Sequence, residues 1–349
     1  MIPEPRGRLA RARPPGATQG RLAAGVSLSA PGVIAITGLG SFIGRRLVER
    51  LLVRSPHLRV VGLDVRRPFR LDGRVAFHRI DLTEPTADGR IAEILAKERV
   101  EALVHAAFRN EPTPDLETDH EIETIGSLHV MHACAEAKVK RLVVASSTML
   151  YGPRPDNPNF LSEAHPLRGH PDAHCVGNRA EMESLLGEWS LRHPDTEVTV
   201  LRHAWIMGPN VWNRVVRYFS LPVVPMLLGY DPLLQFVHEE DCLHAFERAT
   251  REPHPGVYNV VGSGVAPLST LLRLAGKRIL PLPSPLLYRM PYYPSQAQTG
   301  DPPSAFYDYL RWLWVADGAR GFDRFGEPVY TTKEAWISFV SSRRMRRYR

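Results

Sequence analysis

The chain has 349 residues, 44% of them apolar, which is enough to bury a substantial core. Its net charge of +7 lies at the two ends: residues 1–32 carry +4 and residues 343–349 carry +5, which leaves the remainder near −2. This placement argues against a basic nucleic-acid-binding body. No apolar run reaches the roughly 18–20 residues that a membrane-spanning helix needs.

Cysteine usage narrows the class of protein further. Cys134, Cys175 and Cys242 lie far apart and include no C-x-x-C pair. This spacing excludes a disulfide framework and a zinc site, and it favours a reducing cytoplasm as the location.

Both ends of the chain are expected to lie outside the fold. Residues 1–32 are rich in Pro, Gly and Arg and lack the continuous apolar segment of a signal peptide, so we predict a disordered basic tail there. A second basic tail is predicted over residues 341–349. Its arginines would suit contact with nucleic acid or anionic lipid, although such an end is more often only solvated.

The fold begins at residues 33–48, where a short apolar run meets a glycine-dense turn and then a helical pattern. This order predicts a buried parallel strand, a tight turn and a helix N-terminus, which receives a pyrophosphate through its free N–H groups and its dipole. In the pattern T-G-x-x-G-x-x-G, Ser41 takes the second glycine position. The predicted cofactor-binding residues of the turn are Gly38, Gly40, Ser41, Phe42, Ile43 and Gly44. A glycine-rich turn without a ligand would show the same pattern.

A second predicted strand, residues 58–64, ends in Asp64 about twenty residues after the turn. In a dinucleotide-binding fold, a carboxylate there accepts hydrogen bonds from the adenosine ribose and repels a 2′-phosphate, so Asp64 favours NAD. Arg66 and Arg67 follow closely and leave NADP open. The alternative is a strand-end aspartate that caps a turn.

The next part of the chain alternates strands with helices. Strands are predicted over residues 75–80, 101–107 and 141–147, and helices over residues 91–97 and 116–137. The alternation predicts an α/β fold with a doubly wound parallel sheet.

Small and polar residues follow these strands where a cofactor would lie. Ala106 and Ala107 suit close approach of a cofactor, and Asp81 and Leu82 follow the strand before them. His105 is expected to be structural rather than a base.

An ordered set of motifs runs through the chain. It comprises Thr37-Gly38 with Gly44, Asp64, Asp81-Leu82, His105-Ala106-Ala107, and the segments 145–152 (ASSTMLYG), 201–209 (LRHAWIMGP), 235–241 (QFVHEED) and 256–259 (GVYN). Over residues 33–340 this set resembles the extended short-chain dehydrogenase/reductase family, in its NAD-dependent epimerase/dehydratase branch.

The resemblance implies a Rossmann domain over residues 33–200 that binds NAD or NADP, with residues 201–262 partly returning to it. It also implies a smaller, interleaved substrate-binding part over residues 203–340, often for a nucleotide sugar. By the same resemblance Asp81, Leu82, Ala106, Ala107 and Arg179 contact the cofactor. Paired long helices in the family imply a homodimer.

Proteins of this family pair a catalytic tyrosine with a lysine one helical turn later, and a serine holds the substrate oxygen. Ser147 matches that serine, with a capping serine as the alternative. The best alignment puts Cys175 in the tyrosine position and Arg179 in the lysine position. A register shifted by one gives His174 and Asn178.

Two further departures from the family pattern are Glu123, where asparagine is usual, and His203, where proline is usual. The departures therefore cluster on the nicotinamide side of the implied site. Arg179 can still hydrogen-bond a ribose, but a permanent cation cannot tune a neighbour as lysine does.

The roles of Cys175 and His174 stay open. A thiolate activated by Arg179 is one hypothesis for Cys175, and a small apolar residue on a helix face is the other. His174 is an alternative base because its ordinary pKa of about 6.5 suits proton transfer.

The C-terminal half carries fewer signals. Short strands are predicted near residues 223–226 and 233–236, and a helix over residues 238–249, whose first turn contains Asp241. The aromatic residues between Tyr288 and Trp314 are expected in the core or around an apolar pocket. The sequence contains no metal-ligand cluster.

Three functions follow from the sequence as hypotheses. The first is an epimerase, dehydratase or reductase that uses NAD(P) and an altered acid/base set on a nucleotide sugar or another hydroxyl or carbonyl substrate. The second is an inactive NAD(P)-binding sensor or scaffold. The third, a nucleic-acid or anionic-surface binder acting through the arginine tails, is disfavoured by the charge of the body.

Overall fold

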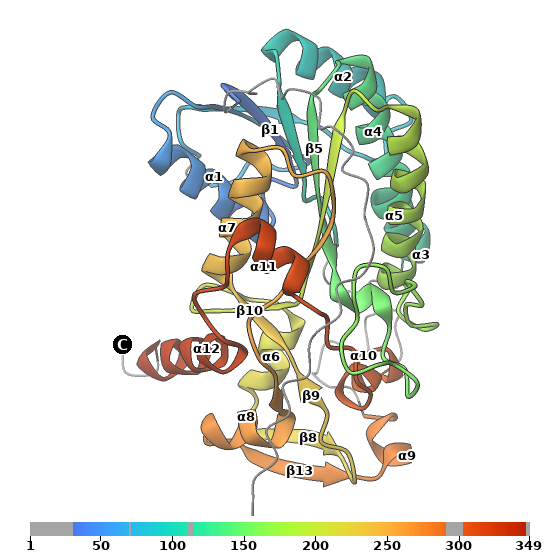
Figure 1. Cartoon of the computed structure of the whole chain (residues 1–349), viewed down its shortest axis with the longest axis vertical. Helices are drawn as coiled ribbons and strands as arrows, with labels where there is room; N and C mark the ends of the chain where they lie inside the picture. The colour runs from blue at the N-terminus through green and yellow to red at the C-terminus, as the bar shows by residue number, and fades with distance from the viewer. Residues whose placement is uncertain (1–30, 70, 110–114, 291–302, 347–349) are drawn as a thin grey trace, which may run out of the picture.

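The computed structural model describes residues 31–69, 71–109, 115–290 and 303–346. A seven-stranded sheet forms the upper part of the molecule, and every neighbouring pair of strands is parallel (Figure 1). The strand order is β11-β6-β5-β4-β1-β2-β3. The strands are β1 (Val33–Thr37), β2 (Arg59–Asp64), β3 (Val75–Arg79), β4 (Ala102–His105), β5 (Arg141–Ser147), β6 (Glu197–His203) and β11 (Gly256–Val260). The predicted doubly wound parallel sheet is confirmed.

Helices cover both faces of this sheet (Figure 1). α1 (Phe42–Arg54) and α7 (Glu239–Arg251) pack on one face, and α2 (Ala87–Glu98), α4 (Gly126–Glu136) and α5 (His174–Arg192) pack on the other. The central strands are therefore buried on both sides, which explains why they are continuous apolar runs without alternation. The strand order reverses between β1 and β4, where parallel sheets open a ligand crevice.

The single helix predicted over residues 116–137 is interrupted. It consists of α3 (Leu116–His120), a π-helical turn η1 (Glu121–Ile125) and α4. Such turns are rare, and they often occur at functional sites. The turn places Glu123 in the interior, where its side chain is fully buried.

The smaller part of the chain lies below the sheet and contains three two-stranded sheets (Figure 1). They pair β7 (Trp205–Met207) with β10 (Phe236–His238), β8 (Val223–Leu227) with β13 (Arg278–Leu282), and β9 (Leu233–Leu234) with β12 (Ala266–Pro267). A short helical segment, η2 (Thr148–Tyr151), follows β5. Among the described residues, the helical segments of the smaller part are α6 (Arg214–Ser220), α8 (Leu268–Leu274), α9 (Ser284–Leu287), α10 (Ser304–Tyr307), η4 (Asp308–Leu310), α11 (Ala319–Phe325) and α12 (Thr332–Arg346).

Part of the predicted C-terminal tail belongs to a helix. Helix α12 continues through Arg346, so residues 341–346 of the predicted C-terminal tail are helical. Residues 1–30 and 347–349 lie outside the described residues.

Aromatic side chains form much of the core of the smaller part. Trp205 and Trp314 meet edge to face with ring centroids 4.9 Å apart, and Tyr218 meets Phe306 in the same way at 5.0 Å. All four side chains are buried. The described part of the aromatic stretch thus serves mainly in packing.

Asp241, on α7, accepts hydrogen bonds from the backbone N–H groups of residues 329 and 330 at 2.9 and 3.0 Å and anchors that loop.

A buried polar network joins the sheet to α5. The Arg202 guanidinium on β6 donates to the Glu183 carboxylate, with Nη2 2.6 Å from Oε2, and its Nη1 donates to the Tyr151 hydroxyl at 3.0 Å. Tyr151 in turn donates to the Asn259 side-chain carbonyl at 2.7 Å, and Ser146 donates to Glu183. These charges satisfy one another, so removing one partner leaves the other buried and uncompensated.

We expect Glu183→Ala to lower the free energy of unfolding by about 3–5 kcal/mol, because it strands the Arg202 charge in the interior. Urea denaturation of the full chain measures this loss. The matched control is Arg248→Ala, which removes an exposed ion pair with Glu252 and should cost less than about 1 kcal/mol. Equal losses in the two variants would contradict the account.

Candidate functional site

Two adjoining cavities lie at the carboxyl ends of the central strands. The larger, about 1240 Å³, lies between the glycine turn, the end of β2 and the segment after β3. The smaller, about 210 Å³, lies between the ends of β5 and β6 and the start of α5. The two share Ser41, Ala106, Phe108 and Arg109 in their walls, so they form one continuous site.

The glycine turn at the larger cavity requires glycine at two positions. Gly38 has φ +68°, and a Cβ there would lie 2.5 Å from the carbonyl oxygen of Ala106. A Cβ on Gly44 would collide with the carbonyl of Gly38. Both glycines therefore let the turn pack directly against β4, and they bring the N-terminus of α1 to the cavity.

Ser41, in the second glycine position of the motif, has a defined local role. Its hydroxyl caps α1 by accepting a hydrogen bond from the backbone N–H of Gly44 at 3.0 Å. Because this hydrogen bond turns the Ser41 side chain back onto its own helix, a serine is accommodated at a position where the motif has glycine. The first turn of α1 contains no acidic residue that would oppose a bound anion.

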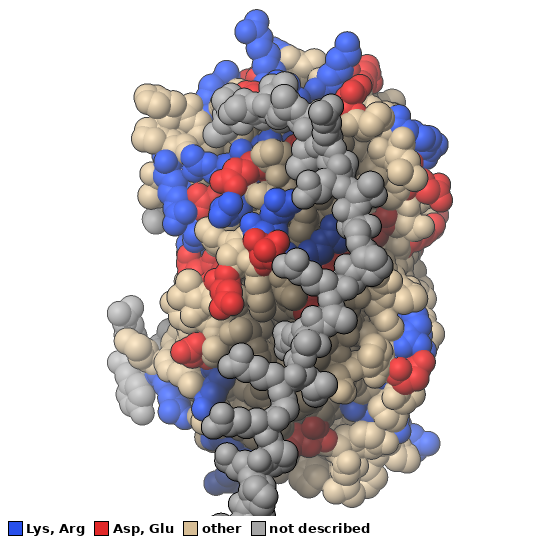
Figure 2. Space-filling model, viewed as in Figure 1, with Lys and Arg blue, Asp and Glu red and all other residues tan. Residues whose placement is uncertain are grey.

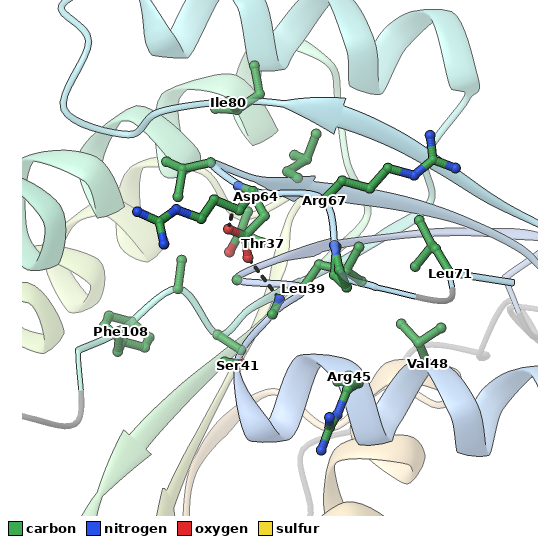
Figure 3. Close-up of a pocket in the computed structure, with 18 of the residues that line it drawn as sticks. Thr37, Leu39, Ser41, Arg45, Val48, Asp64, Arg67, Leu71, Ile80 and Phe108 are labelled. Carbon is green, nitrogen blue, oxygen red and sulfur yellow. Dashed lines mark hydrogen bonds between the residues drawn. The ribbon is translucent and has the colours of Figure 1, made fainter.

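Asp64 lies at the end of β2 in the larger cavity (Figure 3). Its Oδ2 accepts from the backbone N–H of Gly40 at 2.8 Å and its Oδ1 from that of Arg66 at 3.2 Å. The carboxylate thus braces the glycine turn, and each oxygen keeps capacity for another donor. Arg45 and Arg67 lie in the wall of the same cavity (Figure 3).

Asp81, Leu82, Ala106 and Ala107 also line the larger cavity. His105, beside them, is buried: Nδ1 bonds the Thr37 hydroxyl at 2.6 Å and Nε2 bonds the Ser127 hydroxyl at 2.9 Å. Burial, assisted by the charge of Arg179, lowers the pKa of His105 to about 3. Both ring nitrogens are occupied, which is the arrangement of a structural histidine.

Ser147, Cys175 and Arg179 all line the smaller cavity. Ser147 comes from the end of β5, and the other two come from the first two turns of α5. His174 is the first residue of α5; its side chain is exposed and does not line either cavity. The structure therefore brings the residues of the first register together and leaves His174 outside.

Arg179 and Glu123, two of the departures from the family pattern, are bonded to each other. Nη2 of Arg179 lies 3.0 Å from Oε1 of Glu123 and also donates to the carbonyl of Arg109 at 3.0 Å. The guanidinium stacks over the Phe108 ring, 4.6 Å from its centroid. Burial raises the pKa of Glu123 to about 7, although the neighbouring Arg179 opposes that rise.

His203 is the residue that sequence reasoning missed. In the sequence it stands out only as a replacement for proline, yet it lines the smaller cavity beside Ser147, its direct partner in the β5–β6 register. Its Nδ1 donates to the carbonyl of Ala204 at 2.9 Å. Burial lowers the pKa of His203 to about 4, against the Ala204 bond and with a contribution from Arg179. Only the pairing of β5 with β6 reveals this proximity.

Two further searches of the described residues concern membrane-spanning helices and metal sites. Among them, no helix is long and apolar enough to cross a membrane. Within the same ranges no three His, Cys, Asp or Glu side chains come together in a way that could hold a metal ion.

The parallel sheet, the glycine turn and the crevice at its strand-order reversal define a protein of the Rossmann class. The model of the NAD dependent epimerase/dehydratase family matches residues 34–261, and the chain belongs to this family.

Two relatives are similar to this chain in sequence. An uncharacterized protein of Mycobacterium tuberculosis is 29% identical over 324 residues, which cover 90% of this chain and 84% of that protein. UDP-D-apiose/UDP-D-xylose synthase 2 of Arabidopsis thaliana is 31% identical over 157 residues, covering 42% of this chain and 39% of the synthase.

Two solved structures share the fold. UDP-glucose 4-epimerase of Thermotoga maritima with UDP-glucose superposes with a TM-score of 0.68 at 17% identity, covering 90% of this chain and 99% of the epimerase. dTDP-glucose 4,6-dehydratase of Bacillus anthracis with NAD gives 0.70 at 14% identity, covering 90% and 96%.

We expect Gly38→Ala to weaken NADH binding by roughly tenfold or more and to lower the melting temperature, because the residue has positive φ and no room for a Cβ. NADH fluorescence titration measures the first effect. Gly89→Ala is the control, since a Cβ there would meet nothing within 4 Å. NADH binding within twofold of the unmodified protein in Gly38→Ala would contradict the assignment of the turn.

We also expect the Arg179–Glu123 pair to show strong coupling. Glu123→Asn alone leaves a buried cation unpaired and should cost about 3–5 kcal/mol of unfolding free energy. Adding Arg179→Lys restores the family pattern at both positions and should recover about 1 kcal/mol or more. A double-mutant cycle in urea tests this, and strictly additive losses would contradict it.

Proposed function

We propose that this chain binds NAD in the larger cavity and uses the smaller cavity to oxidise, reduce or epimerise a hydroxyl or carbonyl substrate with an altered acid/base set. One observation carries the proposal: Ser147, Cys175, Arg179 and His203 converge on a cavity that continues the glycine-turn cavity. The solved structures of similar fold include enzymes crystallised with NAD or with nucleotide sugars, which supports NAD as the cofactor and a nucleotide sugar as one candidate substrate.

The residues present fit a dinucleotide. Gly38 and Gly44 let the turn pack closely enough to present the N-terminus of α1, which would hold the pyrophosphate, and Asp64 would bind the adenosine ribose. When bound, NAD⁺ supplies a hydride acceptor. Asp64 favours NAD, while Arg66 and Arg67 in the same wall keep NADP as the alternative cofactor.

The chain's own residues would act on the substrate side. The Ser147 hydroxyl accepts a hydrogen bond from the backbone N–H of Met149 at 3.2 Å, so its own proton is free to bond a substrate oxygen. Arg179 keeps a positive charge beside the cavity and would bond the nicotinamide ribose. Cys175 lies in the wall, where the family has its tyrosine.

A second candidate function is an inactive NAD(P)-binding sensor or scaffold. The Arg179–Glu123 ion pair favours it, because Glu123 engages the cation that replaces the family lysine. A nucleic-acid binder finds less support: on the face shown in Figure 2, Lys and Arg are interspersed with Asp and Glu. We also infer that the protein works in the cytoplasm and forms the homodimer common in the family.

The test is NADH and NADPH titration of the full chain, followed by incubation with NAD⁺ and UDP-glucose, UDP-galactose or dTDP-glucose while absorbance at 340 nm and products are followed. We expect tight NADH binding and turnover, and we expect Ser147→Ala to lower kcat about 100-fold with NADH affinity unchanged.

Ser184→Ala, on the exposed side of α5, is the control. NADH binding without turnover would favour the sensor, and no dinucleotide binding at all would refute both candidates.

A further inference from the structure

The smaller cavity has an apolar wall. Its lining includes Phe42, Phe108, Met149, Val176, Trp205 and Val211. With a volume of about 210 Å³, it has room for a compact group rather than an extended one. An apolar wall stabilises a ligand by removing its apolar surface from water.

Several polar side chains in this wall are already engaged by the protein. Asn213 caps α6 by accepting from the backbone N–H of Val216 at 2.9 Å, and Ser41 caps α1. Arg179 pairs with Glu123, and Arg109 pairs with Asp119 at 3.2 Å. A sugar ring would need a partner for each hydroxyl group that it buries here, and each unpaired group costs about 1–3 kcal/mol.

Ser147 and His203 are two polar groups of this wall that stand side by side. Ser147 and His203 are directly paired across the parallel strands β5 and β6, so their side chains lie on the same face of the sheet. The Ser147 hydroxyl has a proton to donate, as argued above.

The tautomer of His203 is set by its backbone bond. The Ala204 carbonyl can only accept, so Nδ1 carries the proton and Nε2 carries a lone pair. Within the described residues Nε2 has no hydrogen-bond partner, and the side chain lines the cavity. A proton acceptor thus stands next to a hydroxyl donor.

We propose that the smaller cavity receives a compact apolar secondary or benzylic alcohol, with Ser147 holding its oxygen and Nε2 of His203 accepting its hydroxyl proton. The proposal rests on the proposed function and narrows its substrate class. In the oxidation, the carbon–hydrogen bond breaks with its electron pair going to NAD⁺ as hydride. The O–H bond breaks with its proton going to Nε2, and the carbon becomes a carbonyl.

The experiment uses the full chain saturated with NAD⁺ and labelled with ¹⁵N-histidine. The probes are benzyl alcohol and cyclohexanol, compared with UDP-glucose. We expect both alcohols to shift the Nε2 resonance of His203, which is assigned by its loss in His203→Gln, and UDP-glucose to leave it unmoved. We also expect both alcohols to raise absorbance at 340 nm.

His203→Gln should lower kcat for the alcohols about 100-fold while KM stays within about threefold. The control His132→Gln, on the exposed side of α4, should match the unmodified protein. The proposal is overturned by a response of His203 to UDP-glucose alone, by no response to either alcohol, by a shift without oxidation, or by a His203→Gln rate above a tenth of normal. NADH titration separates these failures from failure of cofactor binding, which would refute the proposed function itself.

Discussion

The close approach of the glycine turn to β4 is the constraint on which the site depends. Gly38 packs against the backbone of Ala106 with no space for a side chain, and Gly44 packs against Gly38 in turn. This contact brings α1 to the point where the strand order reverses. Both cavities open there and share part of their walls, so the turn determines where a dinucleotide and a substrate would meet.

On the substrate side, the departures from the family pattern are physically connected. Arg179 keeps a permanent positive charge in a buried site, and Glu123 adds a carboxyl group that an asparagine would lack. Arg179 and Glu123 compensate each other, and the π-helical turn η1 carries Glu123 into reach. Each group therefore gives the other a hydrogen-bonded partner of opposite sign in the interior.

The smaller cavity combines this closed ion pair with an apolar wall and a neutral histidine. Burial and the nearby Arg179 charge keep His203 unprotonated near neutral pH, so the ring is an acceptor in the resting protein. Ser147 supplies the complementary donor across the β5–β6 register. Ser147 and His203 differ in residue type from a tyrosine–lysine pair, yet they place a hydrogen-bond donor and an acceptor side by side in the wall of the smaller cavity.

Local patterns in the sequence were sufficient for the strands, the parallel sheet and the glycine turn, because apolar runs, alternation with helices and the need for glycine are properties of short segments. The interruption at residues 121–125 and the helical end at residues 341–346 were not predicted, since packing decides both.

The sequence by itself also identified Ser147, Cys175 and Arg179 as residues that belong together, through their order in the family motifs. Only the tertiary structure decided that Arg179 is paired with Glu123 and that His203 stands beside Ser147. Those contacts join residues 56 positions apart in each case, and the strand order and helix packing that create them are properties of the whole fold.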